Sequence, residues 1–151
     1  MGIMGAVADA VMANKGHVIG VLPKFLQTKE VAHTGLSELI LVETMHERKT
    51  KMFQLSEGFI ALPGGFGTLE EVVEILTWQQ LGLHQYPVGF LNVEGYYDHL
   101  RLFFQQMEKS HLLRTDHLDM AIFNATVPGL LQDMRSYQPP EVPKWLHKSS
   151  T

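Results

Sequence analysis

The 151-residue sequence contains no cysteine. This absence excludes disulfides, thiolate metal ligands and a cysteine nucleophile, and it gives no sign of an oxidising compartment. No apolar run approaches the roughly 20 residues that span a bilayer. The start, residues 1–5, also lacks the basic and apolar regions of a secretory signal. We therefore expect a cytoplasmic protein with no membrane partner.

Strong charge of one sign is lacking as well. Twelve Lys and Arg residues stand against 16 Asp and Glu residues, and the basic ones are scattered rather than gathered into a stripe that could follow a polyanion. We expect no nucleic-acid partner, whereas a single nucleotide fits, because one phosphate needs only a helix N-terminus and one or two cations. The length predicts one domain over residues 1–151, with residues 138–151 as an extended tail.

Short β-branched runs alternate with amphipathic stretches, a pattern typical of βαβ units. The fold class is therefore expected to be α/β and Rossmann-like, with a mostly parallel sheet flanked by helices. The predicted strands are apolar on both faces, as in sheets covered on each side, and comprise residues 18–22, 39–43, 59–62, 88–93 and 121–124. The predicted helices comprise residues 6–15, 45–56, 69–81, 96–109 and 128–137, the first three ended by Gly16, Gly58 and Gly82.

A glycine-rich segment, residues 63–71 (Pro-Gly-Gly-Phe-Gly-Thr-Leu-Glu-Glu), follows the third predicted strand and precedes a helix. Ligand crevices of parallel sheets lie at such strand ends, and a helix start offers N–H groups with a partial positive charge. The spacing is neither the Rossmann nor the P-loop motif. Alternatively, Thr68 and Glu71 form a capping box and merely start the helix. The three-glycine loop favours phosphate binding, since a cap does not need it.

The preceding predicted helix has Thr44 and Glu47 at capping-box spacing, with Arg48 and Lys49 one turn in. Cations near a helix N-terminus oppose its dipole, and an anionic ligand would offset that effect. Helices that follow successive parallel strands begin at the same sheet edge, so we expect Arg48 within reach of the 64–68 loop. The alternative is an ordinary solvated face.

Other motifs fail on inspection. His46-Glu47 begins like the zinc-protease pattern, but Thr50 stands where the second histidine should be. The histidines show no recurrent ligand spacing, so we predict no metal site. The pair Tyr96-Tyr97 is interpreted as packing rather than as a stacking platform.

With these motifs in view, the chain resembles the Lonely Guy family of cytokinin riboside 5'-monophosphate phosphoribohydrolases, often labelled "possible lysine decarboxylase". The matching segments are residues 5–10, 17–23, 45–49, 63–71 and 95–97. The resemblance implies hydrolysis of the N-glycosidic bond of a cytokinin- or adenosine-type nucleoside 5'-monophosphate, such as AMP, to free base and ribose 5-phosphate. It also implies a homodimer and no cofactor.

The resemblance further implies Arg48 and Glu71 as catalytic residues. It implies substrate contacts at Glu30, Lys49, Gly64, Gly65, Phe66, Gly67, Thr68, Leu69, Glu70 and Thr77. Departure of the base builds positive charge at C1', which a carboxylate such as Glu71 can stabilise while it activates water. Arg48 would hold the phosphate or polarise the base. Lysine decarboxylation is not expected, because it needs pyridoxal phosphate on a Schiff-base lysine and nothing marks a lysine for that role.

The chain departs from the family at its start. Related proteins carry two strands and a helix ahead of the position of Met1, including a Gly-Ser loop that resembles a further phosphate contact. Those strands lie between the ones that match residues 18–22 and 39–43. We therefore expect a shortened sheet that lacks the family's first two strands, its gap closed by rearranged pairing or by a second chain. The alternative functions are a non-catalytic carrier of a phosphorylated ligand, like the molybdenum-cofactor carriers, or a homologue of impaired activity.

Overall fold

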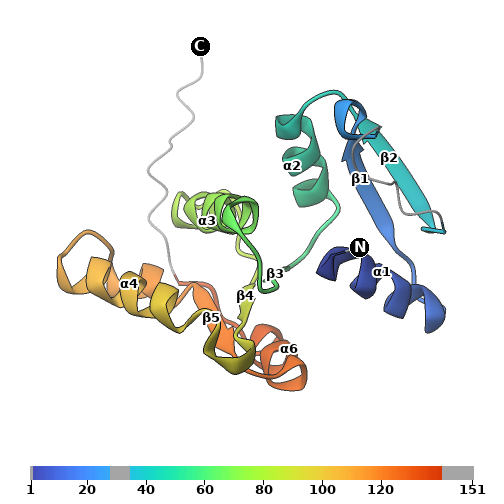
Figure 1. The fold of residues 1–151 in the computed structure, drawn as a ribbon. Coiled ribbons are helices and arrows are strands. Elements are labelled where there is room, and N and C mark those ends of the chain that lie inside the picture. The colour runs from blue at the N-terminus through green and yellow to red at the C-terminus, as the bar shows by residue number, and fades with distance from the viewer. Residues whose placement is uncertain (1, 28–34, 141–151) are drawn as a thin grey trace, which may run out of the picture. The chain divides into compact units, whose positions relative to one another are not determined.

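The computed structural model describes residues 2–27 and 35–140. The chain divides into two compact units, Met1–Ser56 and Glu57–Thr151, and each is described by itself (Figure 1). The single domain expected from the length stays a prediction. Most of the expected tail lies outside the described residues.

The first unit contains two strands that pair in parallel. Its elements are the helix α1 (Ile3–Ala13), the strand β1 (Ile19–Pro23), the 3-10 helix η1 (Lys24–Leu26), the strand β2 (Glu38–Val42) and the helix α2 (Met45–Gln54). β1 and β2 are directly hydrogen-bonded, from Ile19 opposite Glu38 to Pro23 opposite Val42, and α2 packs on both. The expected closing of a gap in the sheet, by rearranged pairing or by a second chain, stays a prediction.

The second unit is built on a parallel sheet of three strands in the order β3-β4-β5. Its elements are β3 (Phe59–Ala61), α3 (Phe66–Gln80), β4 (Val88–Leu91), η2 (Val93–Gly95), α4 (Asp98–Lys109), α5 (Thr115–Leu118), β5 (Ala121–Asn124) and α6 (Val127–Arg135). The α3 helix packs on β3 and β4, and α6 packs on β4 and β5. The α/β class with parallel strands is confirmed, although the described strands form two sheets where we expected one.

The core of the second unit centres on β4, the middle strand, all four residues of which are buried. Phe90 has no exposed surface, and its ring stacks on Phe123 of β5 with the ring centroids 4.6 Å apart. Phe104 of α4 meets Phe90 edge-on. The residues of β4 are thus covered on both faces, as expected of a central strand in a parallel sheet. The other strands are covered less, because Ile60 of β3 and Leu39 and Leu41 of β2 are exposed.

Two of the predicted helix stops differ from the structure. The α1 helix ends in a Schellman motif in which Lys15, with φ of 59°, takes the left-handed position that we expected of Gly16. The α2 helix ends at Gln54, before Gly58. Gly82, with φ of 73°, ends α3 as predicted, its N–H bonded to the carbonyl of Gln79.

The alternative interpretation, in which Thr68 and Glu71 form a capping box at the start of α3, is wrong. The helix begins at Phe66 with Gly65 as its N-cap, so Thr68 is already inside the first turn and cannot cap it. The chain enters the helix early because Gly64 leaves room for Thr68, whose hydroxyl oxygen would lie 2.2 Å from a Cβ atom on Gly64. At α2 the predicted cap forms in part: Thr44 Oγ1 accepts a hydrogen bond of 3.1 Å from the Glu47 N–H, but the Glu47 carboxylate accepts from the N–H of Glu43 and not from that of Thr44.

Candidate functional site

The start of α3 is the candidate anion site of the second unit. The first four N–H groups of a helix have no partner within it and carry a partial positive charge. Gly65 places no side-chain acceptor on them, and the first turn of α3 contains no acidic residue. The glycine segment therefore presents a helix end that a phosphate can use.

The three glycines of this segment have different structural roles. A Cβ atom on Gly64 would clash with Thr68, so the fold itself requires glycine there. At Gly65 and Gly67 a Cβ atom would meet nothing within 4 Å among the described residues, and Gly65 has an ordinary φ of −90°. The absence of a side chain at these two positions keeps the helix end open, which a closely approaching ligand needs.

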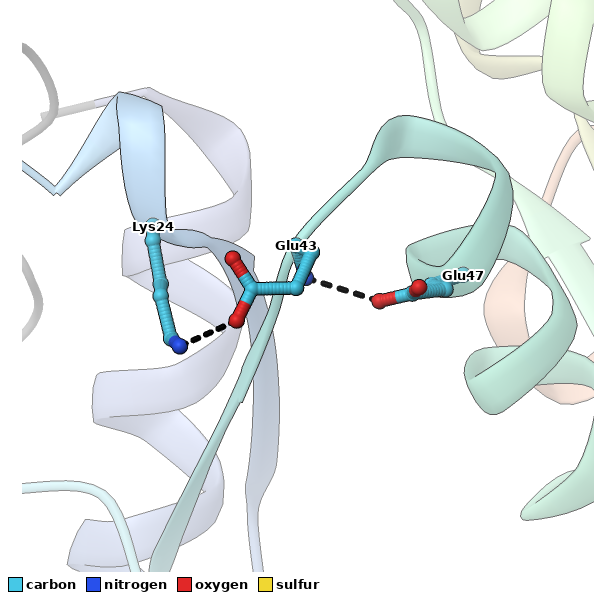
Figure 2. Close-up of polar contacts among 3 residues, drawn as sticks. All are labelled: Lys24, Glu43 and Glu47. Carbon is cyan, nitrogen blue, oxygen red and sulfur yellow. Dashed lines mark hydrogen bonds and ion pairs between the residues drawn. The ribbon is translucent and has the colours of Figure 1, made fainter.

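The start of α2 differs, because carboxylates of the chain itself occupy it. Glu47 Oε2 accepts a hydrogen bond of 2.8 Å from the N–H of Glu43, and the Glu43 carboxylate pairs with Lys24 (Figure 2). Glu43 raises the pKa of the Lys24 ammonium group, first through this hydrogen bond and then through its charge. These carboxylates offset the unfavourable placement of Arg48 and Lys49 near a helix N-terminus, so an anionic ligand is not needed to explain the two cations.

Two tyrosine hydroxyls hold the glycine segment from outside it. Tyr96 donates a hydrogen bond of 2.7 Å to the carbonyl of Gly64, and Tyr97 donates one of 2.5 Å to the carbonyl of Leu62. Sequence reasoning had treated the two tyrosines as packing residues. Their place after a predicted strand could have indicated a contact with the glycine segment, because the carboxyl ends of adjacent parallel strands lie at one sheet edge.

No metal centre is found in the described part of the chain. Among residues 2–27 and 35–140, no group of three or more His, Asp or Glu side chains could hold a metal ion. Within the same residues, no helix is long and apolar enough to cross a membrane.

The chain is similar to a family of known proteins over most of its length. A family model described as "Possible lysine decarboxylase" matches residues 4–134. The chain belongs to this family. It is 45% identical over 139 residues to the probable cytokinin riboside 5'-monophosphate phosphoribohydrolase LOGL9 of Oryza sativa subsp. japonica, covering 92% of this chain and 61% of that protein. It is 41% identical over 139 residues to the phosphoribohydrolase LOG5 of Arabidopsis thaliana, with the same coverages. The chain thus spans about three fifths of the length of these relatives.

This membership confirms the resemblance to the Lonely Guy proteins. Most of the site residues that the resemblance implies lie in one segment. Gly64 to Glu71 lie together on the loop and the first two turns of α3. Glu71 is half-buried there, whereas Glu70 beside it is exposed. Phe66, the first residue of α3, is 92% exposed, so its side chain packs little against the rest of the described chain.

The other family-implied residues lie elsewhere. Thr77 is six residues beyond Glu71, about 9 Å along the helix, and its hydroxyl donates to the carbonyl of Val73. Arg48 and Lys49, both half-buried, belong to α2 of the first unit, so their pairing with Glu71 stays a prediction. Glu30 lies outside the described residues.

Proposed function

We propose that this chain is a nucleoside 5'-monophosphate phosphoribohydrolase. It would cleave the N-glycosidic bond of a cytokinin- or adenosine-type nucleotide and release the free base and ribose 5-phosphate. The observation that carries the proposal is the start of α3, which is opened by Gly65 without a side-chain cap and followed one turn later by the half-buried Glu71. The hydrolase names of the curated relatives support the same reaction.

The proposed chemistry divides between the helix end and the carboxylate. The N–H groups of residues 65–68 bind the 5'-phosphate, and this contact fixes the ribose next to Glu71. As the bond between C1' and the base breaks, positive charge develops at C1', and the Glu71 carboxylate stabilises it. Water then adds its oxygen to C1' and gives a proton to Glu71. This proton passes from Glu71, directly or through water, to the departing base, so that the base leaves neutral and the carboxylate is restored. Arg48 holds the phosphate or polarises the base, and Glu30, Lys49 and Thr77 complete the substrate contacts.

Hydrolysis is proposed over the decarboxylation that the family description names. Removal of the lysine carboxyl group needs an electron-withdrawing cofactor such as pyridoxal phosphate. Hydrolysis of a glycosidic bond needs only water, a carboxylate and a fixed substrate. We propose no cofactor, and we propose a cytoplasmic homodimer, whose stoichiometry light scattering after gel filtration would test.

The decisive experiment incubates the purified protein with AMP and with isopentenyladenosine monophosphate and measures free base by chromatography. Adenosine is the matched control, because it has the same glycosidic bond without the phosphate. We expect base from the nucleotides and at least tenfold less from adenosine. AMP binding without release of base would contradict the hydrolase and support the carrier alternative. Formation of cadaverine from lysine and pyridoxal phosphate would also contradict the proposal.

A further inference from the structure

A buried asparagine joins the ends of two strands to the start of α4. Asn92 follows β4 directly, and its N–H donates a hydrogen bond of 2.8 Å to the carbonyl of Asn124 at the end of β5. Its side-chain Oδ1 accepts from the Tyr97 N–H at 2.6 Å, and its Nδ2 donates to Asp98 at 2.8 Å. Because both ends of this side chain are bonded, the residues that begin α4 are fixed to the sheet.

The turn after Asn92 aims the two tyrosines back at the glycine segment. Glu94 and Gly95 both adopt left-handed conformations, with φ of 51° and 73°. A Cβ atom on Gly95 would lie 2.6 Å from an Asp98 carboxylate oxygen, so this position requires glycine for contact as well as for conformation. The turn therefore has one well-defined geometry, and the positions of the tyrosine hydroxyls follow from it.

The two hydroxyls act on chemically different peptide groups. Tyr97, 2% exposed, binds the carbonyl of Leu62, whose peptide continues into Pro63 and has no N–H. Tyr96, 54% exposed, binds the carbonyl of Gly64, whose peptide carries the N–H of Gly65. That N–H belongs to the N-cap of α3 and is one of the four without a helical partner.

A planar trans peptide directs its N–H opposite to its carbonyl, so the bond from Tyr96 to Gly64 determines where the Gly65 N–H points. A hydrogen bond to the carbonyl also polarises the amide and makes its N–H a stronger donor. Tyr97 has no equivalent effect, since proline contributes no N–H. It can only hold the upstream end of the loop.

We propose that Tyr96 is a positioning residue that orients and polarises the Gly65 N–H for the substrate phosphate, while Tyr97 anchors the loop without acting on a phosphate donor. This inference rests on the proposed function, because it assumes that the phosphate binds at the start of α3. It assigns different roles to two adjacent, chemically identical side chains.

The test removes single hydroxyl groups. For Tyr96→Phe we expect the KM and the Kd for AMP to rise about 3- to 10-fold, with kcat within twofold of wild type and an unchanged Tm. Peptides that cover residues 62–68 should exchange amide hydrogens faster. For Tyr97→Phe we expect a lower Tm with KM within twofold of wild type. The matched control is Tyr137→Phe, whose hydroxyl is bonded to Gln79 instead of the loop and which should change neither KM nor loop exchange.

The outcomes separate this inference from the proposed function. A KM for Tyr96→Phe within twofold of wild type, or an equal rise for Tyr137→Phe, would overturn the role of Tyr96. If wild type binds AMP without cleaving it, hydrolysis fails, and the Kd values alone decide the inference. If wild type binds neither AMP nor inorganic phosphate, the proposed effect of Tyr96 on phosphate binding is overturned as well. Unchanged amide hydrogen exchange of residues 62–68 in Tyr96→Phe would also refute the idea that the Tyr96 hydroxyl holds the loop.

Discussion

Thr68 lies directly against Gly64, so a Cβ atom on Gly64 would stand 2.2 Å from the Thr68 hydroxyl oxygen and 3.0 Å from its Cβ. We predict that Gly64→Ala lowers the free energy of unfolding by about 1–3 kcal/mol, because such a contact forces a side-chain or backbone shift. Urea unfolding measures this change. Adding Thr68→Ala should recover part of the loss, whereas strictly additive effects in the double variant would contradict the contact.

Gly67 offers the opposite test, since nothing among the described residues lies within 4 Å of a Cβ atom there. Gly67 is the second residue of α3, and alanine is favoured over glycine within a helix. Gly67→Ala should therefore raise the free energy of unfolding by about 0.5–1 kcal/mol. The same methyl group would obstruct a phosphate at the helix end, so the Kd for AMP should rise roughly tenfold or more, measured by calorimetry. Higher stability with unchanged affinity would argue against this helix end as the anion site.

The two threonines of the predicted capping boxes should respond differently to loss of their hydroxyls. Thr44 caps α2 through its hydroxyl, so Thr44→Val should lower the free energy of unfolding by about 1 kcal/mol. Thr68 lies inside the first turn of α3, where its hydroxyl does not cap the helix. Thr68→Val keeps the shape of this side chain, so it should lower the free energy of unfolding by less than Thr44→Val does. Chemical denaturation of both variants under one set of conditions gives the comparison. Equal losses would mean that Thr68 caps its helix after all.

The sequence predicted the elements of the fold better than their ends. The strand at residues 121–124 has the predicted bounds, and the strands near residues 18 and 39 are displaced by one residue. These runs are recognisable because strands of parallel sheets are rich in apolar and β-branched residues, even where, as here, they lie at sheet edges. The expectation that a glycine ends each helix misplaced the end of α1, where Lys15 adopts the left-handed conformation in place of Gly16. Gly16 is needed for contact instead, because a Cβ atom there would lie 2.5 Å from a methyl carbon of Val11.

The candidate site was predictable only in part, for a similar reason. The glycine segment follows a strand and contains three glycines, so local chemistry indicates phosphate binding. The start of α3 was misplaced by three residues, because the space that Gly64 leaves for Thr68 is a property of the folded loop. The hydrogen bond of Tyr96 was missed because its acceptor, the Gly64 carbonyl, is 32 residues away. The partnership of Arg48 with Glu71 stays a prediction.

His84 should make the stability of the second unit depend on pH. It is 7% exposed, its Nε2 lies 2.9 Å from the carbonyl of Ile75, and its Nδ1 accepts the N–H of Tyr86. Burial lowers the pKa of His84 below its ordinary value, and the bond to Ile75 opposes this shift only in part. The folded chain therefore resists a proton that the unfolded chain accepts near pH 6.5.

The free energy of unfolding should thus be highest above pH 6.5 and fall as the pH drops toward the folded pKa, by at most about 1.4 kcal/mol per pH unit for one proton. Urea titrations between pH 5 and 8 measure the slope. His84→Gln should flatten it, while the exposed His99→Gln should leave it as in wild type. A wild-type slope that survives in His84→Gln would assign the effect to another group.

Glu71 tests the proposed chemistry most directly. It is half-buried in the second turn of α3, and the carboxylate is proposed to stabilise charge at C1' and to accept a proton from water. Glu71→Gln keeps the size and removes both functions, so kcat with AMP should fall about 100-fold or more while the Kd for AMP stays within about threefold.

Glu74→Gln is the matched control for this change, since Glu74 is half-buried on the same helix but has no role in the proposed reaction. Its kcat should stay within about twofold of wild type. Calorimetry gives the affinities, and single-turnover release of adenine gives the rate of the chemical step. Equal turnover in Glu71→Gln and wild type would reject the carboxylate as the catalytic group. Loss of AMP binding in Glu71→Gln would instead make it a contact for the bound nucleotide, since only a loss confined to turnover identifies an interaction made in the transition state.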